Sequence, residues 1–255
     1  MYFIFKKLKN RLKRYIRFSG IHTRELYHNL TKDKNFSELD DNKQISILND
    51  LKLKGYSFSK VNKKTLDKIK DKFSKIKKFK PFEIKKNYLH QVYGNAIGKD
   101  EEKFFKLIES HLKLDLIAKA YLGKKTHLRY ADFWISKKTK FKPEGSQLFH
   151  LDHEAFNQLK FFIYINNINE KNGCMSIVNK DISYQYQIKN NYKMDQQTKR
   201  VKSENVFSEI IKASGPNGTL LCIDTSQCFH KGGLVTSDDS RFLAMFQYLP
   251  KNSLN

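Results

Sequence analysis

Cysteine is scarce in this sequence, and its scarcity excludes two kinds of site. The three residues, Cys174, Cys222 and Cys228, are an odd number and form no CxxC pair. Neither a disulfide framework nor a zinc knuckle therefore follows from them. We expect free, buried thiols, which suit a reducing cytoplasm.

Long apolar runs are missing as well. No stretch approaches the roughly 18 apolar residues that a membrane span requires. The first residues place Lys6 and Lys7 after a very short apolar run and contain no cleavage-like site, so we expect no secretory signal. Together with the cysteine usage, these absences predict a cytoplasmic protein.

Acidic residues are few, because 26 Asp and Glu face 49 Lys and Arg for a formal net charge of +23. Such a charge suits a nucleic acid or an anionic membrane as partner. The lysines are scattered along the whole chain, however, which favours a solvated basic surface. Arginine occurs at only seven positions, so an arginine such as Arg241 is expected to be used for its planar guanidinium fork.

The sequence does contain enough apolar material for one large core. Hydrophobic residues make up 39% of 255 residues and include 20 Phe and 13 Tyr, which argues against disorder. We expect a basic amphipathic segment over residues 1–35 and a single domain over residues 36–255. That domain is predicted to be helical to about residue 125 and mainly β from residue 126 onward.

Residues 1–20 are predicted to form a basic amphipathic helix. Ile4, Leu8, Leu12 and Ile16 repeat at a spacing of four, and lysines and arginines occupy much of the remaining surface. This pattern suits docking on an anionic membrane surface. It equally suits a helix that packs its apolar stripe on the protein's own core.

Helical spacing continues through the first half and changes to a period of two after Thr126. Leu128, Tyr130, Asp132 and Trp134 then share one face of a strand. Further strands are expected over residues 147–152, 159–165, 174–178, 218–223, 227–231 and 241–249. Many short strands separated by turns favour a β-sandwich or barrel. The polar stretch 180–212 is expected to be a lid or a mobile loop.

Three residues of the second half have the chemistry of an iron site. Residues i and i+2 of a strand project from the same face, so His150 and Asp152 can bind one ion. With His230 they make the two-histidine, one-carboxylate set that holds Fe(II) and leaves coordination positions open. Arg241 shares its strand face with Leu243 and Met245, and a buried guanidinium there requires an anion.

These residues and their flanks resemble the phytanoyl-CoA dioxygenase-like family of Fe(II)/2-oxoglutarate-dependent oxygenases. The resemblance is carried by His150-Leu151-Asp152, by residues 161–173 ending in Asn172-Gly173, by residues 218–230, and by Arg241. Order and spacing agree from about residue 126 to the end. The first half is similar more loosely, through Gly55-Tyr56 and Tyr121-Leu122-Gly123.

The resemblance implies a fold and a reaction. It implies an α+β protein whose mainly β core is a double-stranded β-helix (a jelly roll of the cupin type) flanked by N-terminal helices. It also implies His150, Asp152 and His230 as iron ligands, and Arg241 as the residue that binds the far carboxylate of the cosubstrate 2-oxoglutarate. With O2 as oxidant, such an enzyme releases succinate and CO2 while it hydroxylates a substrate. Related halogenases lack the carboxylate ligand, so Asp152 favours hydroxylation.

The resemblance says less about the substrate. Where the family often has Pro-Gly-Ser-His, this chain has Val178-Asn179-Lys180-Asp181, so an acyl-CoA substrate is not expected to carry over. We predict a small-molecule or lipid-like substrate. Trp134, Phe162 and Asp132 are candidate lining residues of the pocket.

Other functions fit parts of the sequence. A jelly-roll binding protein without catalysis would pair Arg241 with a protein carboxylate and fill the pocket with side chains. A module associated with a membrane surface or another polyanion would use the net charge and residues 1–20. No helix-turn-helix signature or aromatic-interleaved RNA motif is present, so nucleic acid is the least favoured partner.

Overall fold

The computed structural model describes residues 2–17, 19–31, 39, 41–79, 83–91, 98–140, 142–193, 200–251 and 253. Its helices are α1 (Tyr2–Arg17), α2 (Ile21–Thr31), α3 (Asn42–Lys54), α4 (Lys63–Phe79), α5 (Lys99–Leu112), α6 (Leu114–Leu122) and α7 (Lys180–Lys189). Its strands are β1 (Tyr56–Lys60), β2 (Glu83–Lys86), β3 (Leu89–Gln91), β4 (His127–Ser136), β5 (Leu159–Tyr164), β6 (Met175–Ile177), β7 (Ile211–Ala213), β8 (Thr219–Asp224), β9 (His230–Lys231) and β10 (Arg241–Leu249). Two short 3-10 turns span Gly145–Gln147 and Glu204–Val206.

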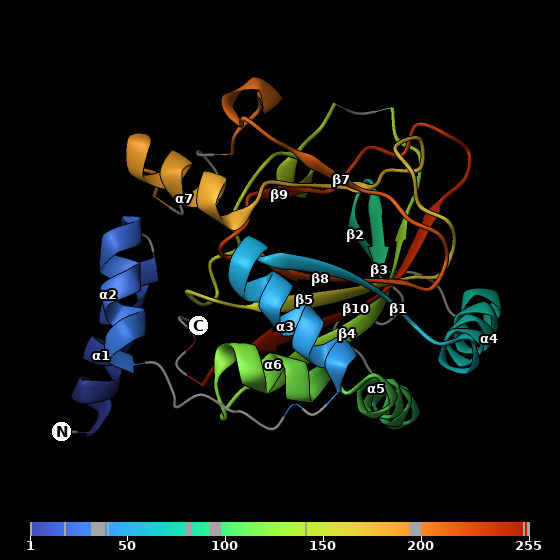
Figure 1. Ribbon diagram of the computed structural model, residues 1–255, viewed down its shortest axis with the longest axis horizontal. Helices are drawn as coiled ribbons and strands as arrows, with labels where there is room; N and C mark the ends of the chain where they lie inside the picture. The colour runs from blue at the N-terminus through green and yellow to red at the C-terminus, as the bar shows by residue number, and fades with distance from the viewer. Residues whose placement is uncertain are drawn as a thin grey trace.

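The strands form two antiparallel sheets. The large sheet has seven strands in the order β1-β8-β5-β10-β4-β3-β2, and the small sheet has three in the order β7-β6-β9. Figure 1 shows β7 and β9 above the large sheet, with helices α3 and α6 on its opposite side. The predicted combination of a mainly β core with N-terminal helices is therefore confirmed.

Alternation along the strands gives the large sheet two different apolar faces. Phe161 of β5, Phe133 of β4 and Phe246 of β10 project toward the helices and pack with buried residues of α3 to α6. Phe162 and Met245, one position away, project instead toward Ile177 of the small sheet. This period of two is the signature of a sheet that is covered on both sides.

The helices are fixed to the large sheet by apolar stripes at helical spacing. In α4, Leu66, Ile69, Phe73 and Ile76 are all buried, and the ring of Phe73 lies 5.4 Å from that of Phe133. Residues three and four apart share one side of a helix, so this stripe faces the sheet. The helical spacing of these four apolar residues thus determines which side of α4 packs on the sheet.

Two of the strands predicted for the second half were wrong, over residues 147–152 and over residues 227–231, of which only His230–Lys231 form a strand. Residues 147–152 do not form a continuous strand, because Phe149 bridges to Val201 whereas His150 bridges to His230. Partners from two separate segments cannot extend one ladder. The stretch 180–212 contains helix α7, whose N-cap is the side chain of Asn179. This helix buries the polar residues Ser183 and Gln187, and its apolar contacts come from the partly buried Ile182 and Tyr186. A stripe of two apolar side chains is too short to indicate a helix from the sequence.

The N-terminal helices α1 and α2 lie at one side of the molecule, next to α7 (Figure 1). Arg24 of α2 is buried and donates a hydrogen bond of 2.6 Å to Gln187 of α7. The predicted helix over residues 1–20 is confirmed as α1, and Ile16 is buried. Leu8 and Leu12 of the same predicted stripe are 55% and 56% exposed, so packing on the core accounts for only part of the stripe. Among the described residues, no helix is long and apolar enough to span a membrane.

We expect Phe246→Ala to lower the free energy of unfolding by about 3–5 kcal/mol, because it leaves a cavity in the aromatic cluster. Phe246 is fully buried and its ring lies 5.5 Å from that of Phe105. Urea unfolding followed by circular dichroism measures the change. Leu107→Ala is the control, since Leu107 lies on α5 and is 44% exposed. Equal losses in both variants would contradict this account of the core.

Candidate active site

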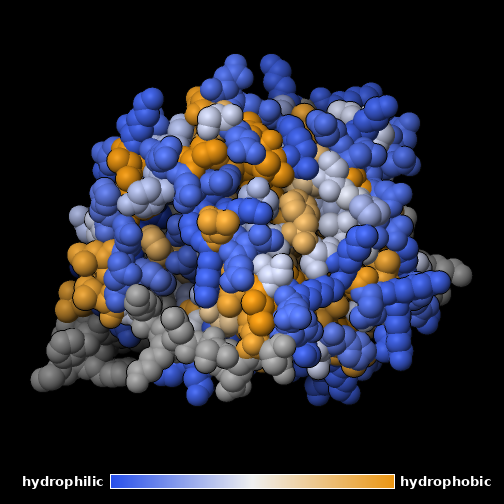
Figure 2. All heavy atoms as spheres, in the orientation of Figure 1, coloured by the Kyte–Doolittle hydropathy of each residue, from blue (hydrophilic) through white to orange (hydrophobic). Residues whose placement is uncertain are grey.

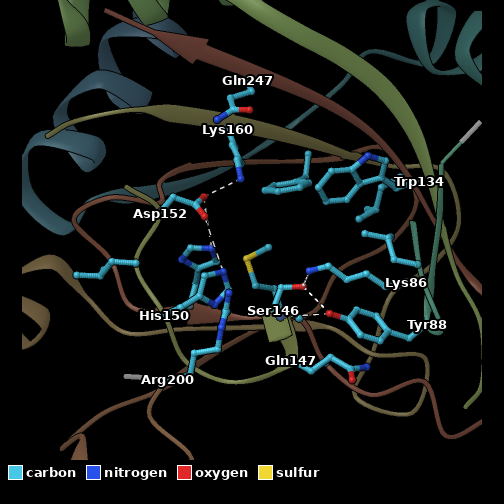
Figure 3. A pocket seen from close by; sticks show the side chains of 18 of the residues that line it. Lys86, Tyr88, Trp134, Ser146, Gln147, His150, Asp152, Lys160, Arg200 and Gln247 are labelled. Atoms are coloured by element: carbon cyan, nitrogen blue, oxygen red, sulfur yellow. Dashed lines mark hydrogen bonds and ion pairs between the residues drawn. The ribbon is translucent and has the colours of Figure 1, made fainter. Parts of the chain in front are cut away.

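A cavity of about 550 Å³ lies on the face of the large sheet that is turned toward the small sheet. Pockets of this size hold small organic molecules. Its polar lining comes from β4, β5, β9, β10, the β2–β3 hairpin and the segment 146–154, together with Tyr192 and Arg200. Figure 3 shows side chains from these separate segments pointing into one space.

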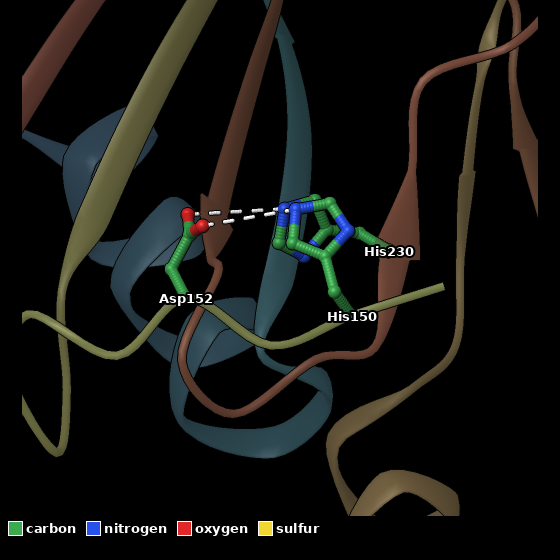
Figure 4. Close-up of side chains that lie close together, drawn as sticks. All are labelled: His150, Asp152 and His230. Atoms are coloured by element: carbon green, nitrogen blue, oxygen red, sulfur yellow. Dashed lines mark ion pairs between the residues drawn. The ribbon is translucent and has the colours of Figure 1, made fainter. Parts of the chain in front are cut away.

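His150, Asp152 and His230 are brought together in this cavity, as the sequence predicted (Figure 4). His150 Nε2 lies 3.8 Å from Asp152 Oδ1, and His230 Nε2 lies 3.8 Å from Asp152 Oδ2. One ligand atom of each residue lies within 4.8 Å of the others, a spacing that suits a shared metal ion. Two imidazoles and one carboxylate fit iron and leave positions open for other ligands.

The backbone fixes this arrangement. His150 and His230 exchange two N–H···O hydrogen bonds of 3.0 Å, which join the segment before Asp152 to strand β9. The backbone N–H of Asp152 donates to the carbonyl of Thr225 at 2.8 Å. Each of the three residues is therefore anchored by its main chain before any metal is considered.

The imidazoles present their Nε2 atoms to the shared space. His150 Nδ1 lies 2.8 Å from the carbonyl of Leu148, and His230 Nδ1 lies 3.0 Å from that of Cys228. A carbonyl only accepts, so each Nδ1 carries the proton and each Nε2 has a free lone pair. A backbone partner on the far nitrogen is how metal-binding histidines are commonly oriented.

Electrostatics keep the three groups in the protonation states that bind a metal. Burial lowers the pKa of His150 and of His230, so both imidazoles are neutral near neutral pH. Burial alone would raise the pKa of Asp152, but the charge of Lys160 and its hydrogen bond outweigh burial and hold the pKa well below its usual range. The site thus contains two neutral imidazoles and one carboxylate.

Lys160 is the nearest charged partner of this group. Its Nζ donates a hydrogen bond of 2.6 Å to Asp152 Oδ2, and both side chains are 14% exposed (Figure 3). The sequence analysis gave Lys160 no role. Lys160 lies on the cavity side of β5, and Asp152 lies eight residues earlier in a segment that is neither helix nor strand.

Arg241 lies in the same cavity and contacts neutral groups. Its Nη2 donates to Ser136 Oγ at 2.9 Å, and its Nη1 donates to the carbonyl of Gly173. Its buried Nε has no hydrogen-bond partner among the described residues, and no ion pair joins Arg241 to a carboxylate there. A guanidinium that is 8% exposed and lacks an anion fits the far carboxylate of 2-oxoglutarate.

Of the three candidate lining residues, two line the cavity. Trp134 and Phe162 do, with ring centroids 6.0 Å apart. Asp132 is completely buried outside the lining, where its Oδ1 accepts a hydrogen bond of 2.7 Å from the backbone N–H of Phe133. Sequence reasoning gave no role to several other polar lining residues: Lys86, Tyr88, Tyr130, Ser146, Lys160, Arg200 and Gln247. Only Arg200 carried a usable signal, because arginine is rare in this chain.

A comparison with protein families identifies the family to which the chain belongs. The family model described as "Phytanoyl-CoA dioxygenase (PhyH)" matches residues 58–243, which include all three candidate ligands and Arg241. The chain belongs to the phytanoyl-CoA dioxygenase family. No curated protein matched the chain.

Solved structures of this family type share the fold at low sequence identity. The alpha ketoglutarate-dependent epimerase SnoN from nogalamycin biosynthesis is 12% identical with a TM-score of 0.62, over 82% of this chain and 84% of its own. EctD from S. alaskensis is 14% identical with a TM-score of 0.58, over 87% and 82%. HygX from Streptomyces hygroscopicus, solved with nickel, 2-oxoglutarate and hygromycin B, is 11% identical with a TM-score of 0.51, over 83% and 88%.

These likenesses confirm the predicted cupin-like jelly roll, and the family gives the protein its class. SnoN has also been solved with Fe3+ and alpha ketoglutarate bound. The protein is an iron- and 2-oxoglutarate-dependent enzyme of the oxygenase type.

We expect Lys160→Met to lower the free energy of unfolding of the metal-free protein by about 3–5 kcal/mol, because it leaves a buried carboxylate without its cation. Urea unfolding at neutral pH measures this loss. The double variant Lys160→Met/Asp152→Asn removes both charges and is expected to recover much of the stability. A single variant as stable as the wild type would show that the ion pair of 2.6 Å contributes nothing.

Proposed function

We propose that the protein hydroxylates a small-molecule or lipid-like substrate, with 2-oxoglutarate as cosubstrate and release of succinate and CO2. The observation that carries the proposal is the convergence of His150, Asp152 and His230 in a cavity that Arg241 also lines. The presence of Asp152 supports hydroxylation, because a carboxylate ligand occupies the position that a halide would need. When bound, iron with 2-oxoglutarate would supply the activation of O2 that this reaction requires.

In this proposal each residue has one task. His150 and His230 bind the iron through Nε2, and the carbonyls of Leu148 and Cys228 hold the two rings in place. Asp152 would bind through one oxygen while Lys160 donates a hydrogen bond to the other, which favours monodentate coordination by the carboxylate. Arg241 and Ser136 bind the far carboxylate of 2-oxoglutarate and so orient its opposite end toward the iron.

A binding protein without catalysis is less well supported. It would pair Arg241 with a protein carboxylate and fill the cavity with side chains. The described residues instead leave about 550 Å³ of space and give Arg241 a hydroxyl and a carbonyl as partners.

Asp152→Ala is expected to weaken Fe(II) binding by at least about tenfold, because it removes the only anionic ligand. Arg241→Gln is expected to keep iron but to weaken 2-oxoglutarate binding about tenfold or more, through loss of a charge-assisted contact. Anaerobic titration of each protein, followed by the visible charge-transfer band of the iron chelate, measures both affinities. Succinate formation on a substrate panel then reports turnover.

Arg129→Gln is the control for Arg241, since Arg129 lies on β4 outside the cavity lining. Wild-type iron affinity in Asp152→Ala, in a protein shown to be folded, would overturn the assignment of the ligands. An unchanged affinity for 2-oxoglutarate in Arg241→Gln would overturn only the assignment of the cosubstrate contact.

We also propose that the enzyme is cytoplasmic and contacts an anionic membrane surface through α1. Leu8, Leu12 and Tyr15 lie at positions i, i+4 and i+7 and are 55%, 56% and 70% exposed. Exposed Arg11 and Arg14 border this row, so apolar and cationic groups share one surface. In Figure 2 hydrophobic side chains also gather at the left edge, over the neighbouring helix α2, where Leu26 and Leu30 are exposed.

Flotation with liposomes tests this contact. We expect the wild type to float with vesicles that contain phosphatidylglycerol and not with neutral ones, and binding to weaken as salt is raised. Leu8→Ser/Leu12→Ser should reduce the bound fraction several-fold, whereas Leu107→Ser, on the exposed side of α5, should not. A wild type that ignores anionic vesicles would refute the contact and leave the catalytic proposal untouched.

A further inference from the structure

Two cations of the cavity have no task in the proposed binding of iron and 2-oxoglutarate. The charged lining consists of four cationic and two anionic side chains: Lys86, Lys160, Arg200, Arg241, Asp152 and Glu154. Lys160 is paired with Asp152, and Arg241 is assigned to the cosubstrate. Lys86 and Arg200 are left.

These two cations converge on one turn although they are distant in sequence. Lys86, at the end of β2, donates a hydrogen bond of 3.2 Å to Ser146 Oγ. Arg200 donates through Nη1 to the carbonyl of Gly145 at 2.7 Å. Figure 3 shows Ser146 between the two side chains, with Arg200 reaching toward the imidazole of His150. Charge from both therefore faces the same part of the cavity.

The turn beneath them is held in place. Tyr88 Oη lies 2.8 Å from Ser146 Oγ and accepts a hydrogen bond of 3.2 Å from the Ser146 backbone N–H. Gly145 has a φ of +52°, and a Cβ there would lie 3.2 Å from Tyr88 Oη and 3.6 Å from Lys86 Nζ. A side chain at position 145 would thus intrude on the space next to the ammonium group.

Neither cation is neutralised by the described part of the protein. Their hydrogen-bond partners are a hydroxyl and a carbonyl, and no ion pair there involves Lys86 or Arg200. The two carboxylates lie on the other side, since Asp152 contacts Lys160 and Glu154 acts on the same lysine. The cavity is therefore cationic at the Ser146 end.

One part of the wall is apolar. Trp134, Phe162 and Leu243 line it from three strands of the large sheet, and Met175 lines it from the small sheet. A molecule that fills both regions would combine an anionic group with an apolar body. Partly desolvated guanidinium and ammonium groups recognise phosphate, sulfate or carboxylate oxygens.

We propose that Lys86 and Arg200 form an anion subsite that selects a substrate with a phosphate, sulfate or carboxylate group attached to an apolar body. The inference rests on the proposed function, because the subsite lies beside the candidate iron ligands. The anionic group would be held at Ser146, and the apolar body would extend along Trp134 and Phe162.

Calorimetry with matched probes tests the subsite. Protein loaded with Ni(II) and saturated with 2-oxoglutarate is titrated with phenyl phosphate and phenol, and with phenylacetate and phenylacetamide. We expect each anion to bind at least about tenfold more tightly than its neutral partner. Arg200→Gln and Lys86→Gln should each lose most of this preference, and Arg200→Lys should keep part of it. The two pairs distinguish phosphate from carboxylate.

Lys202→Gln is the matched control, because it removes one exposed positive charge two residues from Arg200. Equal binding of anions and neutral partners, or an anion preference that survives in Arg200→Gln and Lys86→Gln, would overturn the subsite. So would a loss of 2-oxoglutarate affinity in these variants that matches Arg241→Gln, because the two cations would then belong to the cosubstrate site.

The same titrations separate this inference from the proposed function. Without metal and 2-oxoglutarate, the anion preference is measured again in the wild type and in both subsite variants. If metal-loaded protein fails to bind 2-oxoglutarate while the anion preference persists and depends on Arg200, the proposed function fails and the subsite stands. If 2-oxoglutarate binds and the preference is absent, only the subsite fails.

Discussion

The pair of backbone hydrogen bonds between His150 and His230 is the contact on which the site depends. It joins a segment without regular strand structure to the two-residue strand β9, and it sets the two imidazoles 4.4 Å apart, centroid to centroid. Asp152 follows two residues later and is fixed by Thr225. A buried backbone N–H or C=O group without a hydrogen-bond partner is costly, so breaking this pairing would destabilise the folded protein. The positions of the three candidate ligands are therefore set by the main chain.

The two faces of the large sheet have different roles: one packs against the helices and the other lines the cavity. One face carries Phe133 and Phe246, which pack against Phe105 of helix α5. The other face carries Lys160, Trp134 and Arg241 into the cavity. The cost of burying polar groups on the second face is limited by their hydrogen bonds to Asp152 and Ser136. A rigid, apolar support thus stands directly behind a polar site, which keeps the distances between polar groups fixed.

Much of this could be predicted from sequence because it depends on parity. Strand β10 was predicted at its observed bounds, and with it the face that Arg241 shares with Leu243. The ligand trio was predicted from residue types and order that resemble the family, although residues 147–152 do not form the strand that was expected there. Helix α7 was missed because polar Ser183 and Gln187 share its buried side with only two apolar residues, Ile182 and Tyr186. The role of Lys160 was missed because its partner comes from another segment. Lys86 and Arg200 meet at Ser146 only through tertiary folding, and no local pattern encodes such a meeting.

The hydrogen bond from Arg24 to Gln187 fixes helix α2 to helix α7, and so joins the N-terminal helices to the domain that contains the cavity. Burial lowers the pKa of Arg24 to about 10, so it remains charged near neutral pH, and its amide partner sits on the helix that precedes Tyr192 and Arg200 in the cavity wall. His28 adds a stacked contact of 4.8 Å with Phe156, close to the iron ligands in sequence. A recombinant protein shortened to begin at α3 would uncover this side of α7 and the loop after Asp152. The N-terminal helices therefore stabilise the segments that line the cavity, and they should be retained in any preparation used to study the enzyme.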